Sequence, residues 1–190
     1  MADLLLVRHA ETEWSRTRRH TGRTDVPLTD GGRQAARRLR PRLEGRAGGL
    51  VLTSPLSRAA ETAALAGLRA EAEDGLLEWD YGDYEGRTTS EIRAERPDWY
   101  LFRDGAPGGE LPGDVGARAD AVITRVLAVL DEGSEVVLVA HGHLLRVLAA
   151  RWLEQDASFG GRLWLGTGSL SLLGFEREVR VVRSWNEERP

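Results

Sequence analysis

The sequence predicts an α/β fold, a three-layer sandwich in which helices cover both faces of a mostly parallel sheet. Three short runs are apolar at every position: Leu4–Val7, Leu50–Leu52 and Val136–Ala140. Continuous apolar runs that alternate with helical patterns are typical of parallel strands buried on both faces. The segments between the runs therefore supply the covering helices.

The first two helices are defined by their spacing and by their first residues. One follows Thr29 and places apolar residues four apart, at Ala35, Leu39 and Leu43. A second is expected to begin at Ser54-Pro55, because a serine cap followed by proline is a common helix start. The arginines at positions 37–42 are expected to form the exposed face of the first helix.

Two further helices and a strand pair are expected in the second half of the chain. One helix begins near Asp114 and the other near His143. Ser169–Phe175 and Val179–Trp185 flank a short turn, which indicates an antiparallel pair. The apolar stripes of the two helices are Val115, Ala119, Val122, Val126 and Leu130 in the first, and Leu145, Leu148, Ala149 and Trp152 in the second.

The segment Asp74–Gly113 interrupts this alternation and is rich in glycine, tryptophan and tyrosine. Thr88 and Glu91 have the spacing of a capping box, which indicates a helix start. Long segments of this kind often bind ligands or act as lids. We expect one domain over residues 1–190, with a loop-and-helix excursion at about 74–113 over the active site. Its aromatic residues are expected to pack the excursion onto the sheet: Trp79, Tyr81, Tyr84, Trp99 and Tyr100.

Composition excludes several classes of protein. A chain of 190 residues without cysteine has no disulfides, no thiol nucleophile and no Cys-ligated zinc. Its net charge of −4 gives no general attraction to nucleic acid or to an anionic membrane. The N-terminal segment lacks the features of a secretory signal, and no apolar stretch approaches the roughly 18 residues of a membrane span. We therefore expect a cytoplasmic location.

All 26 basic residues are arginine. The simplest interpretation is codon choice in a GC-rich genome. The chemical consequence is that every cationic side chain is a planar fork suited to phosphate or carboxylate, and that no lysine Schiff base can form.

Polar residues follow each apolar run, where the strands are expected to end at one crevice. Arg8 and His9 follow the first run, and Arg58 lies in the first turns of the helix after the second. His141 and His143 follow the third run at a helix start, which favours anion binding. Glu11 and Glu78 are candidate acid–base carboxylates.

Each of these signals has a simpler explanation when it is taken alone. His141 and His143 have the spacing of a zinc pair, but a zinc site needs a third ligand with defined geometry, and no supporting motif identifies one. Arg16, Arg18 and Arg19 are a candidate nucleic-acid contact, although a solvated loop or a pocket rim explains them equally well.

The combination of motifs resembles the histidine phosphatase superfamily, the phosphoglycerate-mutase-like proteins, whose opening motif is Arg-His-Gly. Five segments resemble that family in order and spacing: LLLVRHAETEW at Leu4–Trp14, HTGRTDVPLTDGGRQA at His20–Ala35, TSPLSRAAETA at Thr53–Ala63, LLEWDYGDYEG at Leu76–Gly86, and VLVAHGHLLR at Val137–Arg146. The stretch EWDYGDYEGRTTSEI is most similar to a phosphatase branch that contains actinobacterial acid phosphatases and sugar-bisphosphate phosphatases.

The resemblance implies a role for each matching residue. His9 would be the nucleophile that becomes phosphohistidine, and Glu78 the proton donor. Arg8, Arg58 and His141 would form the phosphate pocket. Thr21, Gly22 and Tyr81 align with positions that line the substrate pocket in the mutase branch. Ser15, Arg23 and Gly142 are further candidates for phosphate or substrate binding.

Two positions depart from the family pattern. Ala10 replaces the motif glycine, which is harmless at negative φ and obstructive at positive φ. Ser15 stands where many members have an asparagine that contacts phosphate, and its hydroxyl retains one hydrogen-bond donor.

The implied function is metal-independent hydrolysis of small phosphomonoesters, such as phosphosugars or sugar-acid phosphates, with no cofactor and with an acidic pH optimum set by Glu78. A second anionic group on the substrate would be bound by a rim of Arg16, Arg19 and Arg23. Two alternatives stay open: a cofactor-dependent phosphoglycerate mutase, and a catalytically silent phosphate-binding module. Neither nucleic acid nor membrane is expected as a partner. Dimers are common in the family, so a homodimer is an expectation that rests on the resemblance.

Overall fold

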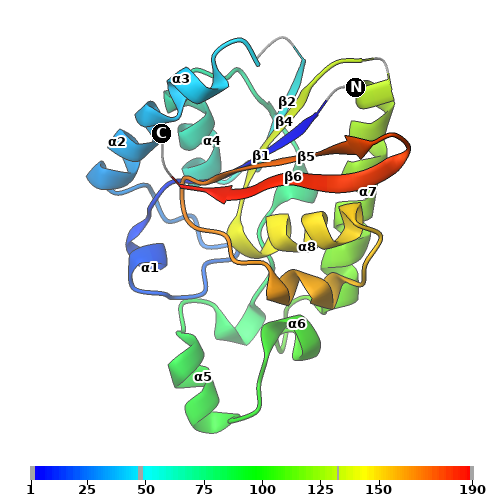
Figure 1. Ribbon diagram of the computed structural model, residues 1–190. Helices are drawn as coiled ribbons and strands as arrows, with labels where there is room; N and C mark the ends of the chain where they lie inside the picture. The colour runs from blue at the N-terminus through cyan, green and yellow to red at the C-terminus, as the bar shows by residue number, and fades with distance from the viewer. Residues whose placement is uncertain (1–2, 47–48, 132, 189–190) are drawn as a thin grey trace.

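The computed structural model describes residues 3–46, 49–131 and 133–188, and its centre is a six-stranded sheet (Figure 1). The strand order is β3-β2-β4-β1-β5-β6. β1 pairs with β4, β4 with β2, and β2 with β3, all in parallel. β5 is antiparallel to both β1 and β6. The strands are β1 (Leu4–Arg8), β2 (Leu50–Thr53), β3 (Glu71–Ala72), β4 (Val136–Ala140), β5 (Leu170–Glu176) and β6 (Val179–Glu187).

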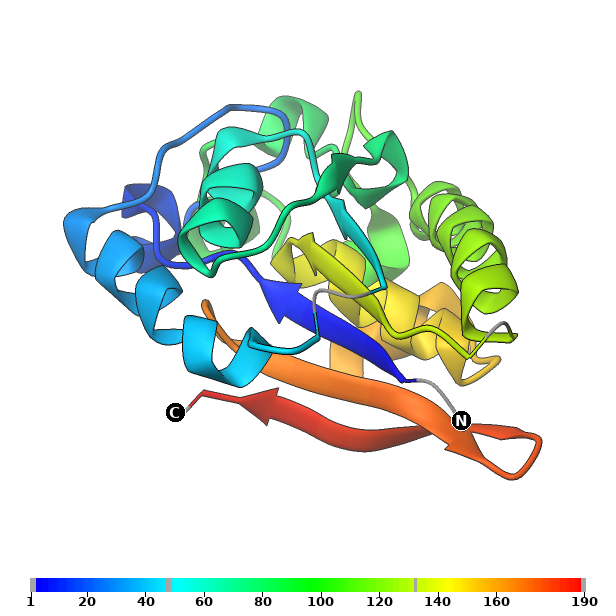
Figure 2. The same ribbon diagram turned by 90° about the horizontal axis from the view of Figure 1, so that it is seen from above.

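Helices cover both faces of this sheet (Figure 2), which confirms the predicted α/β fold class. Leu5 and Val7 of β1 pack with the helices of one face, and Leu4 and Leu6 pack with those of the other. Successive side chains of a strand point to opposite faces, so an unbroken apolar run fills both layers. The first face carries α2 (Asp30–Arg38), α3 (Arg40–Leu43) and α4 (Ser57–Leu65), and the second carries α7 (Pro112–Asp131) and α8 (Gly142–Trp152).

Three details differ from the expectations. The helix expected to begin at Ser54 begins at Ser57, because the Ser54 hydroxyl contacts His141 instead of capping a helix. The helix after Thr29 is divided at Leu39, where Pro41 in the next turn lacks an N–H to continue the hydrogen-bond ladder. The short strand β3 was not predicted, since its two exposed residues carry no apolar signal. The expected pair of late strands is confirmed as β5 and β6.

The excursion between β3 and α7 passes the carboxyl ends of the strands, with α5 and α6 at the lower end of Figure 1. Its side chains Trp79, Tyr81, Tyr84 and Trp99 are buried in the larger core cluster, as expected, whereas Tyr100 is 38% exposed. The predicted capping box of Thr88 and Glu91 begins α5. The short elements here and elsewhere are η1 (Asp74–Leu76), η2 (Gly82–Tyr84), α5 (Thr89–Glu95), α6 (Leu101–Asp104), α1 (Glu13–Arg16) and η3 (Ala157–Arg162).

In the part of the chain that the structure describes, no helix combines the length and apolar character needed to cross a membrane.

Candidate active site

The carboxyl ends of β1, β2 and β4 bring the predicted residues together at one edge of the sheet. The His9 N–H donates to the carbonyl of Ala140, the last residue of β4, at 2.8 Å. The ring centroids of His9 and His141 are 5.1 Å apart. Adjacent parallel strands end at the same edge, so this convergence follows from the strand order.

His9 is buried and held in one tautomer. Its Nδ1 lies 2.7 Å from the carbonyl oxygen of Ala10. A carbonyl only accepts hydrogen bonds, so Nδ1 carries the proton and Nε2 keeps a free lone pair. Burial, reinforced by the positive charges of Arg8 and Arg58, lowers the pKa of His9 well below its usual 6.5. The imidazole is therefore neutral and nucleophilic at Nε2 near neutral pH.

The departure at Ala10 does not strain the backbone. Among the described non-glycine residues, positive φ angles occur at Arg18, Glu154, Arg177 and Asn186, and not at Ala10. The Ala10 methyl is completely buried with Leu28 and Ala36. Replacement of the family glycine by alanine therefore adds apolar packing beneath His9.

Arg8 lies against the start of α8 with an unused donor. Its Nη1 donates to the carbonyl of Leu165. Its buried Nε has no hydrogen-bond partner within the described residues. A Cβ at Gly142 would lie 3.0 Å from Arg8 Cζ, so only glycine lets the helix start this close to the guanidinium. Arg8 Nε can therefore donate a hydrogen bond to an anion bound beside His9.

Arg58 is fully buried and fixes the tautomer of His141. Its Nε donates to His141 Nδ1 at 3.2 Å. His141 Nδ1 is thus an acceptor, and Nε2–H donates to the Ser54 hydroxyl at 2.7 Å. Burial, and next the charge of Arg58, lowers the pKa of His141 well below 6.5. His141 is therefore a neutral hydrogen-bond donor in this site.

The loop after His20 holds Arg58 through backbone carbonyls. Arg58 Nη2 donates to the carbonyls of Thr21 at 3.1 Å and Gly22 at 2.9 Å, and Nη1 donates to that of Thr24 at 2.9 Å. A Cβ at Gly22 would lie 2.5 Å from the Trp79 carbonyl oxygen. Thr21 and Gly22, which the resemblance assigns to the substrate, thus position Arg58 in this structure.

Glu78 is buried at the N-terminus of α8. Its Oε1 accepts hydrogen bonds from the N–H groups of Trp79 and Leu144, both at 2.9 Å, and its Oε2 accepts one from His143 N–H at 3.0 Å. The carboxyl group is therefore fixed in orientation. Oε2 accepts only one of these bonds and so retains a lone pair that can carry the transferred proton.

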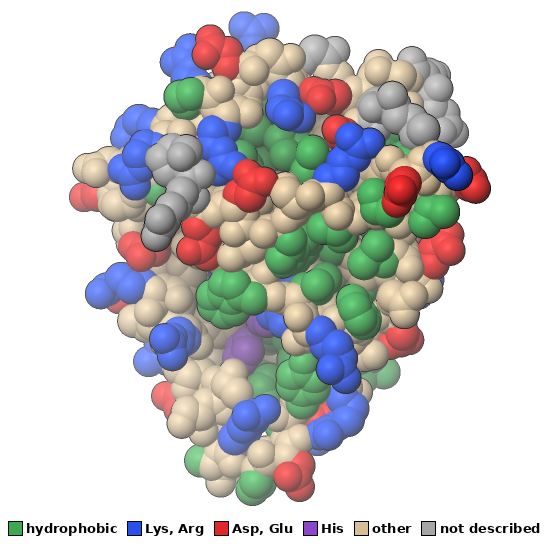
Figure 3. Space-filling view, viewed as in Figure 1, with side chains coloured by type: hydrophobic (Ala, Val, Ile, Leu, Met, Phe, Trp, Pro, Cys, Tyr) green, Lys and Arg blue, Asp and Glu red, His purple; other side chains and the backbone are tan. Residues whose placement is uncertain are grey.

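An aromatic cluster lies beside Glu78. The Tyr81 hydroxyl contacts His143 Nδ1, and the ring of Tyr81 is 4.8 Å from that of His20. Burial, and next the Glu78 carboxylate, raises the pKa of Tyr81 well above 10. Tyr81 is therefore a neutral side chain in the site. Figure 3 shows a histidine at the bottom of a hollow on this face, with basic side chains around it.

The structure places several candidates away from His9 or commits them to other partners. Ser15 does not offer its hydroxyl hydrogen to a ligand, because that hydrogen goes to the Thr12 carbonyl at 2.9 Å in the cap of α1. The Glu11 carboxylate accepts from the Thr29 hydroxyl at 2.9 Å, which removes it from the acid–base candidates.

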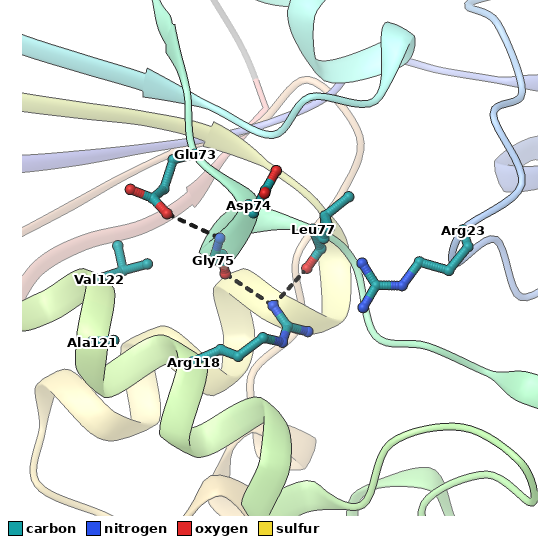
Figure 4. Close-up of a pocket in the computed structure, with 8 residues that line it drawn as sticks. All are labelled: Arg23, Glu73, Asp74, Gly75, Leu77, Arg118, Ala121 and Val122. Carbon is teal, nitrogen blue, oxygen red and sulfur yellow. Dashed lines mark hydrogen bonds between the residues drawn. The ribbon is translucent and has the colours of Figure 1, made fainter.

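The predicted arginine rim is dispersed. Arg16 is paired with Glu13, and Arg19 donates to the carbonyl of Gly86. Arg23 instead borders a separate cavity of about 490 Å³ (Figure 4). Its guanidinium lies 3.5 Å from Asp80, so its charge is already partly compensated. A second anionic group on a substrate would compete with that carboxylate.

Two residues of the site were missed as functional candidates. The Thr62 hydroxyl accepts from Ala10 N–H at 3.1 Å and donates to the Arg58 carbonyl at 2.7 Å. Thr62 thus joins the end of β1 to α4. Ser54 was considered only as a helix cap, although the three-dimensional proximity of β2 and β4 directs its hydroxyl to His141.

His141 and His143 do not form a zinc pair, since the first faces Ser54 and the second faces Tyr81. Across the described ranges, no group of three or more His, Asp or Glu side chains is close enough to hold a metal ion.

A neutral histidine flanked by arginines at the end of a parallel sheet defines a site for nucleophilic attack on an anionic phosphoryl group. Residues 4–188 match the model of the histidine phosphatase superfamily (branch 1). The chain belongs to this superfamily, and it is a phosphatase.

Known proteins of this superfamily align over nearly the whole chain. An acid phosphatase of Mycobacterium tuberculosis is 43% identical over 94% of this chain and 89% of its own length. Sedoheptulose 1,7-bisphosphatase of Saccharomyces cerevisiae is 32% identical, over 97% of this chain and 75% of its own. The solved structure of an open reading frame product of M. tuberculosis superposes with a TM-score of 0.92, at 39% identity and over 99% of both chains.

A probable phosphoglycerate mutase of Photorhabdus laumondii is also 32% identical, over 97% of this chain and 90% of its own. Relatives named as phosphatases and relatives named as mutases therefore both align over the length of this chain.

Proposed function

We propose that this protein hydrolyses small phosphomonoesters without a metal, through a phosphohistidine formed on His9. The observation that carries the proposal is the environment of His9, a buried neutral imidazole whose Nδ1 is held by the Ala10 carbonyl while Nε2 stays free. Arg8 is the residue before His9, and Arg58 contacts His141, whose ring centroid lies 5.1 Å from that of His9, so both arginines can neutralise phosphate charge at this site.

In the first step, Nε2 of His9 attacks phosphorus while the bond from phosphorus to the ester oxygen breaks. The leaving oxygen takes a proton from Glu78 and departs as an alcohol. Arg8 Nε, which has no other partner among the described residues, supplies a donor for the oxygens of the transferred group, and Arg58 supplies positive charge. The Nε2–H of His141 reaches these oxygens when it exchanges its bond to the Ser54 hydroxyl for one to phosphate. The N–H groups of His143 and Leu144 at the start of α8 are bound to Glu78, so the helix contributes its positive dipole end and not these donors.

In the second step, a water molecule attacks the phosphorus of phosphohistidine. Glu78, now ionised, accepts the proton of this water as the bond from nitrogen to phosphorus breaks. Inorganic phosphate leaves, His9 returns to its neutral form, and Glu78 is again protonated. The same carboxyl group therefore serves as acid and then as base.

The substrate class is the small phosphorylated metabolites, with phosphosugars and sugar-acid phosphates as the first candidates. Support comes from relatives that are an acid phosphatase and a sugar-bisphosphate phosphatase. The partly compensated charge of Arg23 favours monophosphates over a strict requirement for a second phosphate.

Hydrolysis is favoured over mutase activity by the arginines of the excursion. A mutase must retain its phosphoryl group and shield it from water, which calls for free cations in the covering segment. All four arginines between residues 74 and 113 are engaged with groups of the excursion itself: Arg87 with Glu95, Arg93 with the Trp99 carbonyl, Arg96 with the Tyr84 hydroxyl, and Arg103 with Asp104.

The test is phosphate release from a panel of phosphomonoesters at pH 5 to 8 in EDTA. Wild type is expected to turn over, His9→Ala to be inactive, and the matched histidine variant His20→Gln to remain active. Activity retained by His9→Ala would refute the proposal. Binding of phosphomonoesters without turnover by wild type would indicate the silent binding module, and interconversion of phosphoglycerates without phosphate release would indicate the mutase.

A further inference from the structure

Arg118 on α7 is hydrogen-bonded to the segment that carries Glu78, although Arg118 belongs to none of the sequence motifs. Its Nη1 donates to the carbonyls of Gly75 at 2.9 Å and Leu77 at 3.0 Å (Figure 4). Its Nη2 lies 3.5 Å from the carbonyl of Glu78 itself. One guanidinium therefore holds three backbone carbonyls within four consecutive residues.

The other side of the guanidinium binds Glu110. Arg118 Nε lies 2.7 Å from Glu110 Oε1, and Nη2 lies 2.9 Å from Oε2, a bidentate pair with side chains that are only 22% and 16% exposed. Such a fork cannot be reproduced by lysine, because its geometry needs a planar group with several donors. The pair is partly shielded from water and is worth more than an exposed ion pair.

Glu110 in turn forms hydrogen bonds with Trp79 and Asp80, the two residues that follow Glu78. Its Oε2 accepts from Asp80 N–H at 2.8 Å, and its backbone carbonyl accepts from the Trp79 indole at 2.9 Å. The Glu110 N–H donates to the Asp80 carbonyl at 3.0 Å. The backbone is thus fixed immediately before and immediately after the residue whose carboxyl group faces α8.

We propose that Arg118, together with Glu110, is a positioning residue that holds Glu78 in place for proton transfer to the leaving group. The proposal rests on the proposed role of Glu78. Among the described residues, the Glu78 carboxylate accepts hydrogen bonds only from backbone N–H groups, those of Trp79, His143 and Leu144. Its placement therefore depends on the path of the main chain, which Arg118 and Glu110 set. A shift of about 1 Å in a catalytic group can lower the rate by about a hundredfold.

Leaving-group dependence distinguishes positioning of Glu78 from general structural support. p-Nitrophenolate is a stable anion that departs without a proton, whereas the alkoxide of glycerol needs one from a general acid. Loss of an aligned acid therefore slows the release of glycerol far more than the release of p-nitrophenol. A merely loosened fold slows both.

The experiment measures the first turnover of p-nitrophenyl phosphate and of glycerol phosphate in wild type, Arg118→Ala, Glu78→Gln and the double variant. Arg118→Ala is expected to slow glycerol release by about tenfold more than p-nitrophenol release, in the same direction as Glu78→Gln. In the double variant, Arg118→Ala should add less than about threefold to the effect of Glu78→Gln, because both changes act through one carboxyl group.

Arg125→Ala is the matched control. Arg125 is on the same helix and forms ion pairs with Glu71 and Glu73, just before the gripped segment, but it makes no bond to the backbone of residues 75–78. Its removal should leave both rates within about twofold of wild type, because Arg125 is an exposed side chain that bonds only to two carboxylates outside the Gly75–Glu78 segment among the described residues. If Arg118→Ala fails to fold, Glu110→Gln keeps an oxygen for Asp80 N–H, weakens the ion pair and should show the same selectivity in milder form.

Equal slowing of both substrates by Arg118→Ala, or multiplied effects in the double variant, would overturn the positioning role while leaving the role of Glu78 intact. If Glu78→Gln slows the release of glycerol and of p-nitrophenol equally, Glu78 is not the general acid, and the positioning role of Arg118 is refuted with it.

Discussion

The free energy of unfolding should decrease as the pH is lowered, because His20 is protonated more readily in the unfolded chain than in the folded one. Burial lowers the pKa of His20 to about 4, against 6.5 for an exposed imidazole. The unfolded chain therefore binds more protons than the folded one below pH 6.5, so the free energy of unfolding falls as the pH falls. For these two pKa values, the loss between pH 7 and pH 5 is about 2 kcal/mol from His20 alone.

The perturbation is His20→Gln, which removes the titrating ring and keeps a neutral polar side chain. The measurement is urea unfolding of wild type and variant at pH 7 and pH 5. Wild type should lose about 2 kcal/mol more than the variant between the two pH values. His9, His141 and His143 also have lowered pKa values, so the variant should retain a pH dependence of the same sign.

Thr89→Ala is the control for this comparison. The Thr89 hydroxyl lies 3.3 Å from His20 Nε2, so the substitution alters the same contact without removing a titrating group. Its effect on stability should be similar at both pH values. An equal loss of stability with falling pH in wild type and His20→Gln would show that partial burial does not lower the pKa of this ring, and would refute the reasoning.

Three further predictions concern the site. Gly142→Ala should lower kcat/KM by about tenfold or more, because the new methyl displaces the Arg8 guanidinium, with little change in melting temperature; an unchanged kcat/KM would contradict the close approach. Thr62→Val should cost about 1–3 kcal/mol in urea unfolding, since it leaves Ala10 N–H without an acceptor, and Thr62→Ser should restore most of the loss. Turnover per folded molecule should persist from pH 7 down to pH 5, because His9 remains neutral over this range; a fall that follows a titration near 6.5 would count against that.

The main elements of the fold were predictable because strands buried on both faces need apolar residues at consecutive positions. Strands β1, β2 and β4 are buried on both faces and are apolar at nearly every position. By contrast, β3 comprises two exposed residues, and its place in the sheet depends on pairing with β2. Pairing with a neighbour leaves no periodicity in two residues, so local pattern could not identify the strand.

The sequence predicted which residues meet in the site, but it did not predict the hydrogen-bond partner of each one. Arg8, His9, Arg58, Glu78 and His141 do converge at one end of the sheet. The binding roles expected for Ser15 and Arg23 stay predictions, and the structure gives each side chain a neighbour that spacing did not indicate: the Thr12 carbonyl for Ser15 and Asp80 for Arg23. Which partner a polar side chain selects depends on distances that spacing along the chain does not encode.

Local sequence pattern was enough to predict the α/β class and the meeting of Arg8, His9, Arg58, Glu78 and His141 at the strand ends, because buried strands and their polar ends follow from local composition. Tertiary structure alone decided the tautomers of His9 and His141, the cage of carbonyls around Arg58 and the grip of Arg118 on the Glu78 segment. These depend on hydrogen bonds between groups far apart in sequence, such as the pair of Arg58 and His141 at a separation of 83 residues. Folding brings such groups within hydrogen-bond distance of one another, and burial then removes the water that would otherwise satisfy them.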